Sequence, residues 1–337
     1  MIVNTSDLIP AQPHFRTQEE TLPLIREACA ERDDVATFHE LGESEEGRPL
    51  AGVVLADEPA GPETLRALLT NGLRPDSPLR GLLEGFRFVV VPHTNPDGEA
   101  RNQPWIREWP NVARFVQHAQ REEPGRDMEF GFPDLRRENE LVADFLREHG
   151  PYDMHMSLHG MAFAEGAQLL IERRWAERTQ PLRDAYAGVA QELGLGLHDH
   201  NRKGEKGFFY IEPGFATTPE GEAMRAHFRA QGDDDMVSCF LDSSMEFVRS
   251  LGTGDPLCLV TEVPLYRVQP HEDAPPGQPV AYQNLKERLP EVQVHLEEGR
   301  AEKAHALVEP FPIQPVSLRA AMVLHMVALA EGLKAVR

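Results

Sequence analysis

Hydrophobic and polar residues recur with two different periods along this chain, and each period predicts one kind of element. Apolar residues three or four positions apart predict helices over residues 17–31, 63–69, 138–149, 175–193 and from 317 onward. A further helix is expected to start at Thr218-Pro219. Alternating or continuously apolar runs predict strands over residues 35–41, 50–55, 86–91, 152–159 and 257–263. The first helix has a strong start signal, because Thr17 and Glu20 form the sequence pattern of a capping box.

The order of these elements predicts an α/β fold. Strands that alternate with helices favour a mixed, mostly parallel sheet with helices on both faces. The run at 86–91 is broken only by Arg87, which predicts a strand buried on both faces. A length of 337 residues would allow two domains, but the sequence has no repeats and no low-complexity linker. We therefore expect a single domain over residues 1–337.

Composition and charge narrow the function classes. The chain has 34 Lys and Arg residues against 55 Asp and Glu, which gives a formal net charge of -21. Such a negative field repels phosphate backbones and anionic membranes, so neither nucleic acid nor a membrane surface is an expected partner. We see no signal sequence and no apolar run of the ~18 residues that a membrane span needs, and therefore expect a cytoplasmic protein. The cysteines, Cys29, Cys239 and Cys258, are too widely spaced for a CxxC metal site and are expected to be small buried hydrophobes.

Polar motifs follow several of the predicted strands. In α/β sheets, ligand sites form outside the carboxyl ends of strands. This rule selects residues 55–59, 92–98, 157–160 and 261–264. The sharpest local signal is Asn95-Pro96-Asp97-Gly98, although each of these residue types is also favoured in ordinary turns.

Five short motifs occur in one order along the chain: GRPL at 47–50, Glu58-Pro59, NPDG at 95–98, SLHG at 157–160 and TEVP at 261–264. This succession resembles the zinc carboxypeptidases of the carboxypeptidase A type, over residues from about 40 to 265. The resemblance implies an α/β enzyme that uses one Zn²⁺ to remove C-terminal residues from peptides.

The resemblance also implies roles for particular residues. It makes Glu58 and His159 zinc ligands and Glu262 the general base. A hydrolytic zinc takes three protein ligands and a water, and a nearby carboxylate can then accept the proton of that water. His155 lies four residues before His159 on the same predicted strand, so periodicity cannot choose between them; the family pattern selects His159.

One position departs from the family pattern. Leu55 stands where the pattern has a ligand histidine, and leucine has no lone pair to give. The stretch before Glu58 is also short, which fits the loss of a segment that carries this histidine. Asp57 and His93 are the alternatives for the vacant position. We expect an impaired metal site that Leu55→His would restore only if the backbone follows the family's path.

Substrate recognition is expected to fall to arginines, which bind a carboxylate with two parallel hydrogen bonds. By resemblance, Arg137, Arg136 and Asn139 form the segment that grips the terminal carboxylate of a peptide, and Arg107 polarises the scissile carbonyl. Solvated charge at a helix end is the alternative interpretation of Arg107 and Arg137. Tyr210 is a weak counterpart of the family's tyrosine.

Other interpretations stay open. His198-Asp199-His200 has the residue types of a second metal site, but the polar residues that follow favour a loop. An amidohydrolase or deacylase acting on small N-acyl amino acids is an alternative within the same resemblance. A non-catalytic homologue that binds peptides or acidic metabolites is the rival from another class, and Leu55 favours it.

Overall fold

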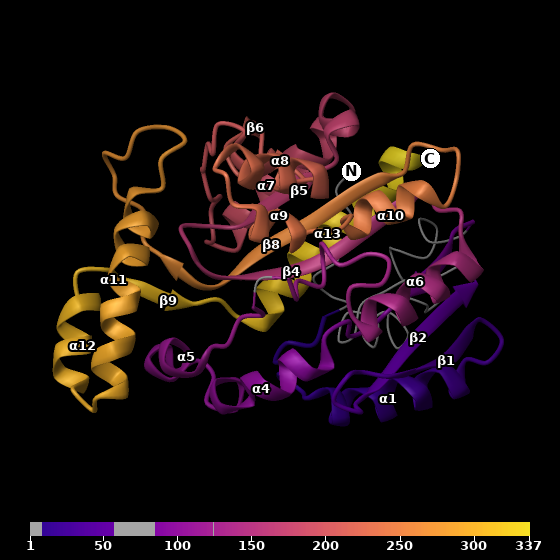
Figure 1. Ribbon diagram of the computed structural model, residues 1–337, viewed down its shortest axis with the longest axis horizontal. Helices are drawn as coiled ribbons and strands as arrows, with labels where there is room; N and C mark the ends of the chain where they lie inside the picture. Colours follow the sequence, from indigo (N-terminus) through magenta and orange to yellow (C-terminus); the bar gives the residue numbers. More distant parts are fainter. Residues whose placement is uncertain (1–8, 57–84, 124) are drawn as a thin grey trace.

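The computed structural model describes residues 9–56, 85–123 and 125–337 (Figure 1). The strands are β1 (Ala36–Glu43), β2 (Pro49–Ala56), β3 (Arg87–Val90), β4 (Met154–Ala164), β5 (Gln168–Ile171), β6 (Tyr210–Glu212), β7 (Phe215–Thr217), β8 (Leu257–Val268) and β9 (Ile313–Pro315). The α-helices are α1 (Gln18–Glu31), α4 (Pro96–Ile106), α5 (Val112–His118), α6 (Arg137–His149), α7 (Gln180–Glu192), α8 (Gly221–Ala230), α9 (Asp234–Ser238), α10 (Ser244–Ser250), α11 (Val280–Glu297), α12 (Ala301–Val308) and α13 (Leu318–Val336). The predicted helix at 63–69 and the candidate ligand Glu58 lie outside the described residues.

The strands form two sheets, of three strands in the order β1-β2-β3 and of six strands in the order β4-β8-β5-β7-β6, with β9 added to β8. The predicted α/β fold with a mixed sheet is confirmed. Its share of parallel pairing is lower than expected: β4–β8 and β5–β7 are parallel, whereas the other pairs are antiparallel. The short connections from β1 to β2 and from β6 to β7 account for two of these antiparallel pairs, because a tight turn can join only antiparallel neighbours.

The boundaries of the elements differ from the predictions in ways that matter for the site. Helices α1, α6 and α13 lie where the sequence predicts them, and α1 has the expected capping box. Strands β4 and β8 continue five residues beyond their predicted ends, so His159 lies within β4 rather than at its end. The predicted helix over 175–193 is broken at Thr179 into a 3₁₀ turn, η3 (Arg173–Arg178), and α7. The predicted start at Thr218-Pro219 is followed by α8 only from Gly221.

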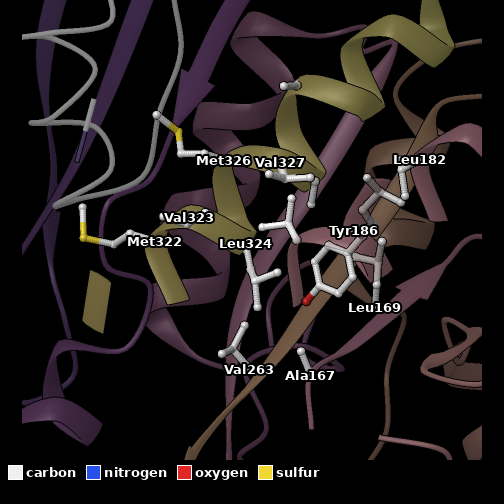
Figure 2. Close-up of a cluster of buried hydrophobic side chains, with 14 of the residues drawn as sticks. Ala167, Leu169, Leu182, Tyr186, Val263, Met322, Val323, Leu324, Met326 and Val327 are labelled. Atoms are coloured by element: carbon white, nitrogen blue, oxygen red, sulfur yellow. The ribbon is translucent and has the colours of Figure 1, made fainter. Parts of the chain in front are cut away.

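The largest hydrophobic core lies around α13. It joins side chains of α13, α7, β5 and β8, of which Leu169, Tyr186, Val263 and Leu324 are labelled in one cluster in Figure 2. The same core contains Leu55 of β2, so it connects the two sheets. Strand β3 is only partly buried, with Arg87 exposed, which differs from the expectation of a strand covered on both faces.

The NPDG and GRPL motifs meet in one buried polar network. Asn95 caps α4 by accepting from the backbone N–H of Gly98. The Asp97 carboxylate, 1% exposed, accepts from Ser44 Oγ at 2.6 Å, Arg48 Nη1 at 2.8 Å and the Glu46 N–H at 3.1 Å. Asp97 therefore fastens the turn between β1 and β2 to the start of α4, which is a structural role.

We expect the Asp97 network to stabilise the fold only above strongly acidic pH. Burial by itself would raise the pKa of Asp97, but the hydrogen bonds from Ser44, Arg48 and Glu46 bring it below the ordinary value of 3.8. A carboxyl with a depressed pKa stabilises the folded state above its unfolded pKa and stops doing so as the pH falls through the folded pKa. Asp97→Asn should lower the free energy of unfolding at pH 7 by about 1.5–3 kcal/mol.

Urea unfolding of both proteins at pH 7 and at pH 3 checks this prediction. The difference between the wild type and Asp97→Asn should shrink at pH 3, which lies below the ordinary value of 3.8 at which the unfolded carboxyl takes up its proton. A difference that is the same at both pH values would contradict an ionised Asp97 as the source of the stability.

Two further expectations concern membranes and cysteines. Within residues 9–56, 85–123 and 125–337, no helix is both long enough and apolar enough to cross a membrane. Cys29 and Cys258 are free and buried, as small hydrophobes would be, and Cys239 is free and partly exposed.

Candidate active site

Strand β4 places three polar side chains on one face of the six-stranded sheet. Met154 and Met156 pack against the core around α13. Because successive side chains of a strand point to opposite faces, His155, Ser157 and His159 project from the other face. Sequence periodicity therefore predicts correctly that His155 and His159 share one face.

The register of the two longest strands brings the predicted ligand and the predicted base together. His159 of β4 is the parallel partner of Glu262 on β8. His159 Nδ1 lies 3.6 Å from Glu262 Oε1, and its Nε2 lies 3.5 Å from Glu129 Oε2. The imidazole ring thus stands between two carboxylates, one on the neighbouring strand and one on the loop before α6.

Electrostatics favour a protonated ring at this position. Burial favours neutral imidazole, but the facing carboxylates of Glu129 and Glu262 outweigh it and raise the pKa of His159 to about 10. Burial likewise acts to raise the pKa of Glu129, but His159, His155 and the Ser244 hydroxyl together hold it below the ordinary value. The three side chains are a charge-coupled cluster that can exchange protons with a water or a substrate beside it.

Glu129 belongs to the site and was missed by sequence reasoning. Its Oε1 accepts from Ser244 Oγ and its Oε2 accepts from Ser157 Oγ at 3.4 Å. It lies in a loop, 28 residues from Ser157 and 115 from Ser244, and it follows no strand. No local pattern in the sequence marks it, so only the fold reveals it.

His155, the rival of His159, has a different environment. Its Nε2 lies 2.8 Å from Ser244 Oγ and 3.5 Å from Ser157 Oγ. Burial lowers the pKa of His155, and the charge of Glu129 offsets this only in part. His155 is therefore a hydrogen-bonded histidine whose two serine partners also contact Glu129.

Arg136 and Asn139, which the resemblance implies for substrate recognition, make internal contacts. Arg136 is 3% exposed and forms an ion pair with the buried Glu138, at 2.7 Å between Nη2 and Oε1. The Asn139 Nδ2 donates to the Met128 carbonyl at 2.9 Å, while its buried Oδ1 has no hydrogen-bond partner. Their substrate-binding roles stay predictions.

Arg137 and Arg107 lie on the surface. Arg137, in the first turn of α6, forms an exposed ion pair with Glu140 at 2.6 Å. Arg107 follows α4, donates from Nε to Gln103 Oε1 at 3.2 Å and lines a surface hollow with Arg114. Among the contacts of the described residues, none joins either arginine to His159 or Glu262. Their roles also stay predictions.

The described residues do not complete a zinc site. Leu55 is 0% exposed, within the hydrophobic core, and supplies no ligand. His93 Nδ1 is buried without a hydrogen-bond partner, and burial lowers the pKa of His93 to about 4. In the part of the chain that the structure describes, no three His, Cys, Asp or Glu side chains are grouped so that they could hold a metal ion. The described residues thus supply fewer than the three protein ligands that a hydrolytic zinc takes, and the candidate ligands Asp57 and Glu58 lie outside the described residues.

The core position of Leu55 also bears on the expected effect of Leu55→His. Leu55→His can restore a ligand only if the backbone follows the family's path, with position 55 facing the metal. Position 55 instead pairs with Ala36 and Phe88 in a three-stranded sheet and packs in the core, so the condition is not met.

The segment His198-Asp199-His200 is a hydrogen-bonded loop. Asp199 accepts from the Tyr210 hydroxyl at 2.8 Å and from the Gly277 N–H at 2.7 Å. His198 is buried, and its Nδ1 accepts from the Glu165 N–H at 3.3 Å. These contacts agree with the polar-loop interpretation, and they show that the hydroxyl of Tyr210 donates to Asp199.

Comparisons with known proteins give structural neighbours only. No protein-family model matches the sequence, and no curated protein is similar to it at a significant level. A metallo-carboxypeptidase from Burkholderia cenocepacia matches with a TM-score of 0.49 at 15% identity, over 95% of this chain and 69% of that one.

A metallo-carboxypeptidase from Pseudomonas aeruginosa, solved with (2-guanidinoethylmercapto)succinic acid, matches with a TM-score of 0.46 at 17% identity, over 96% of this chain and 70% of that one. Carboxypeptidase A from Helicoverpa armigera matches with a TM-score of 0.45 at 13% identity, over 95% and 78% of the two chains. The solved structures that this chain resembles include metallo-carboxypeptidases from bacteria and from an insect.

Proposed function

We propose that this protein is a zinc carboxypeptidase-like hydrolase that acts on C-terminal residues of peptides, with a metal site that is impaired in this chain. The observation that carries the proposal is the pairing of His159 with Glu262 across β4 and β8, 3.6 Å apart. The family resemblance of the sequence motifs implies both roles, His159 as ligand and Glu262 as base. Their convergence is what a hydrolytic site requires.

The described side chains of the candidate site can supply acid and base functions. Glu262 is a partly exposed carboxylate beside His159, placed to take a proton from a water or to return one to a leaving amine. His159 is 37% exposed, so a substrate carbonyl can approach its ring. By resemblance, Glu58 and His159 would be the zinc ligands, and no third ligand is supplied by Leu55. Two ligands are too few for tight zinc binding.

Zinc content and hydrolysis test this proposal together. We expect well under one zinc ion per purified chain and hydrolysis of C-terminal residues close to background. Excess zinc should raise the rate, and Glu262→Gln should lower the zinc-dependent rate about 10²–10⁴-fold, the usual contribution of a general base. Glu123→Ala, an exposed change, is the control. Zinc-dependent hydrolysis that is indifferent to Glu262→Gln would refute the proposed role.

The same assay separates the alternative substrates. Small N-acyl amino acids replace the peptide in a parallel reaction, and preferential cleavage of them would favour an amidohydrolase or deacylase. Full zinc occupancy with rapid hydrolysis in the unmodified chain would mean that Asp57, His93 or another side chain completes the site.

A non-catalytic binding protein is the second candidate, and the burial of Leu55 in the core favours it. If Arg137 grips a terminal carboxylate, Arg137→Ala should weaken binding of a free peptide by about 1.5–3 kcal/mol, the range for a hydrogen bond to a charged group. Calorimetric titration with a peptide acid and its C-terminal amide measures this. Equal losses for the two peptides would show that Arg137 recognises something else.

The proposal treats residues 1–337 as one domain. The continuity of the largest core supports this organisation, because its members run from Ile9 to Leu333 and include residues of both sheets. A chain of two independent domains would divide its core at a boundary.

A further inference from the structure

The loop that carries Glu129 is fixed to the start of α10 by backbone hydrogen bonds. The Ser244 N–H donates to the Glu129 carbonyl at 2.9 Å, and the Leu241 N–H donates to the Phe130 carbonyl at 2.8 Å. The Phe132 N–H donates to the Asp242 carbonyl at 3.1 Å, in an isolated antiparallel bridge. Because these backbone groups are paired, the loop that carries Glu129 is held in place against the start of α10.

Side chains fix the same loop from its other side. Asp127 Oδ1 accepts from the N–H groups of Glu129 at 2.8 Å and Phe130 at 3.3 Å. Asn139 of α6 donates to the Met128 carbonyl. A Cβ at Gly131 would lie 2.6 Å from Asn139 Oδ1, so only glycine allows this approach of the loop to the helix.

The hydrogen bonds around the Glu129 carboxylate have a defined direction. An ionised carboxylate can only accept, so the hydroxyl of Ser244 donates to it. The Ser244 oxygen is then free to accept from Nε2–H of His155, 2.8 Å away. Ser157 donates to the second carboxylate oxygen, which also faces His159 Nε2. Ser244, Ser157 and the His159 ring thus each present a donor to the Glu129 carboxylate.

We propose that Glu129 is a positioning residue that holds the His159 ring with Nε2–H toward itself and Nδ1 toward Glu262. A carboxylate that accepts from one ring nitrogen fixes the orientation of the ring, and so fixes which group the other nitrogen faces. Glu129 is fixed by the loop and by two hydroxyls, so it defines the ring orientation. The inference deepens the proposed function, on which it rests for the placement of His159 in the active site.

Nitrogen-15 NMR of the histidine-labelled full chain tests this assignment. An imidazole N–H that is open to water exchanges too rapidly to be observed, so a visible Nε2–H of His159 requires an acceptor. Couplings to the ring protons distinguish Nε2 from Nδ1, and His159→Gln identifies the signal. We expect Glu129→Ala to abolish the Nε2–H signal of His159, and Glu129→Gln to retain it, because the amide oxygen still accepts.

Three variants make the result specific. Glu123→Ala, on the exposed part of the same loop region, should leave the spectrum unchanged. Glu262→Gln should alter the Nδ1 resonance and leave Nε2–H in place. If Glu129→Ala does not fold, Ser244→Ala carries the test, since removing that hydroxyl must shift the Nε2–H resonance. Retention of the unshifted signal in Glu129→Ala, or in Ser244→Ala, overturns the proposal.

These outcomes are independent of those for the proposed function. Absence of hydrolysis would leave the NMR assignment of Glu129 intact. Loss of the assignment, with hydrolysis that still depends on Glu262, would leave the proposed reaction intact.

Discussion

Leu55→His is expected to lower the free energy of unfolding by about 3–5 kcal/mol and to add no zinc. The wild-type side chain is fully buried on β2, between Ala36 of β1 and Phe88 of β3 in the register of the sheet. The substitution removes leucine packing and buries an imidazole without a partner, and both changes destabilise. Urea unfolding and metal analysis of the purified variant measure the two effects.

Leu55→Met is the matched control, because it keeps an apolar side chain of similar volume. It should cost less than about 1.5 kcal/mol. A histidine variant that is as stable as the wild type and binds one zinc ion per chain would contradict the prediction. It would mean that position 55 faces an open site in solution, as the family pattern requires.

Arg136→Ala is expected to destabilise the protein by about 3–5 kcal/mol, because it leaves a buried carboxylate without its partner. Glu138 is 0% exposed, and Arg136 contacts it with both Nε and Nη2. Arg136 also reaches Glu122 at 3.4 Å and the Arg126 carbonyl at 3.3 Å. Urea unfolding at neutral pH gives the loss.

The neighbouring Arg137→Ala is the control for this experiment. Arg137 and Glu140 form an exposed pair one turn apart on α6, and such pairs contribute less than about 1 kcal/mol. Equal destabilisation by the two substitutions would show that the burial of Arg136 does not govern its contribution. Arg137 is the exposed member of the two arginines, so the comparison also separates an effect on stability from the proposed effect on peptide binding.

Local signals in the sequence located five of the nine strands and five of the eleven α-helices of the described residues, and they failed where long-range pairing decides the outcome. The capping box of α1 and the apolar face of α6 depend on residues a few positions apart, so both helices could be predicted. The ends of β4 and β8 could not, because these two strands extend each other by pairing along residues 154–164 and 257–267. Polar residues within these two ranges resemble those that follow a strand, so the sequence pattern predicts the strand ends too early.

The same distinction applies to the motifs. NPDG and GRPL are recognisable at once, yet their residues meet in a structural network around Asp97. SLHG and TEVP supplied His159 and Glu262, which the strand register sets side by side. A structural motif such as NPDG and a ligand motif such as SLHG contain similar residue types. Their contacts in the folded protein distinguish the two.

The sequence by itself determined the α/β class, the core-facing periods of its helices, and the common face of His155 and His159, because these depend on backbone geometry over a few residues. The tertiary structure decided that Leu55 is a core residue, that Arg136 is a buried ion-pair partner and that Glu129 faces His159. Glu129 and Ser244 are 115 residues apart in the chain. Contacts over such separations arise from the packing of the whole chain, and no period within one element records them.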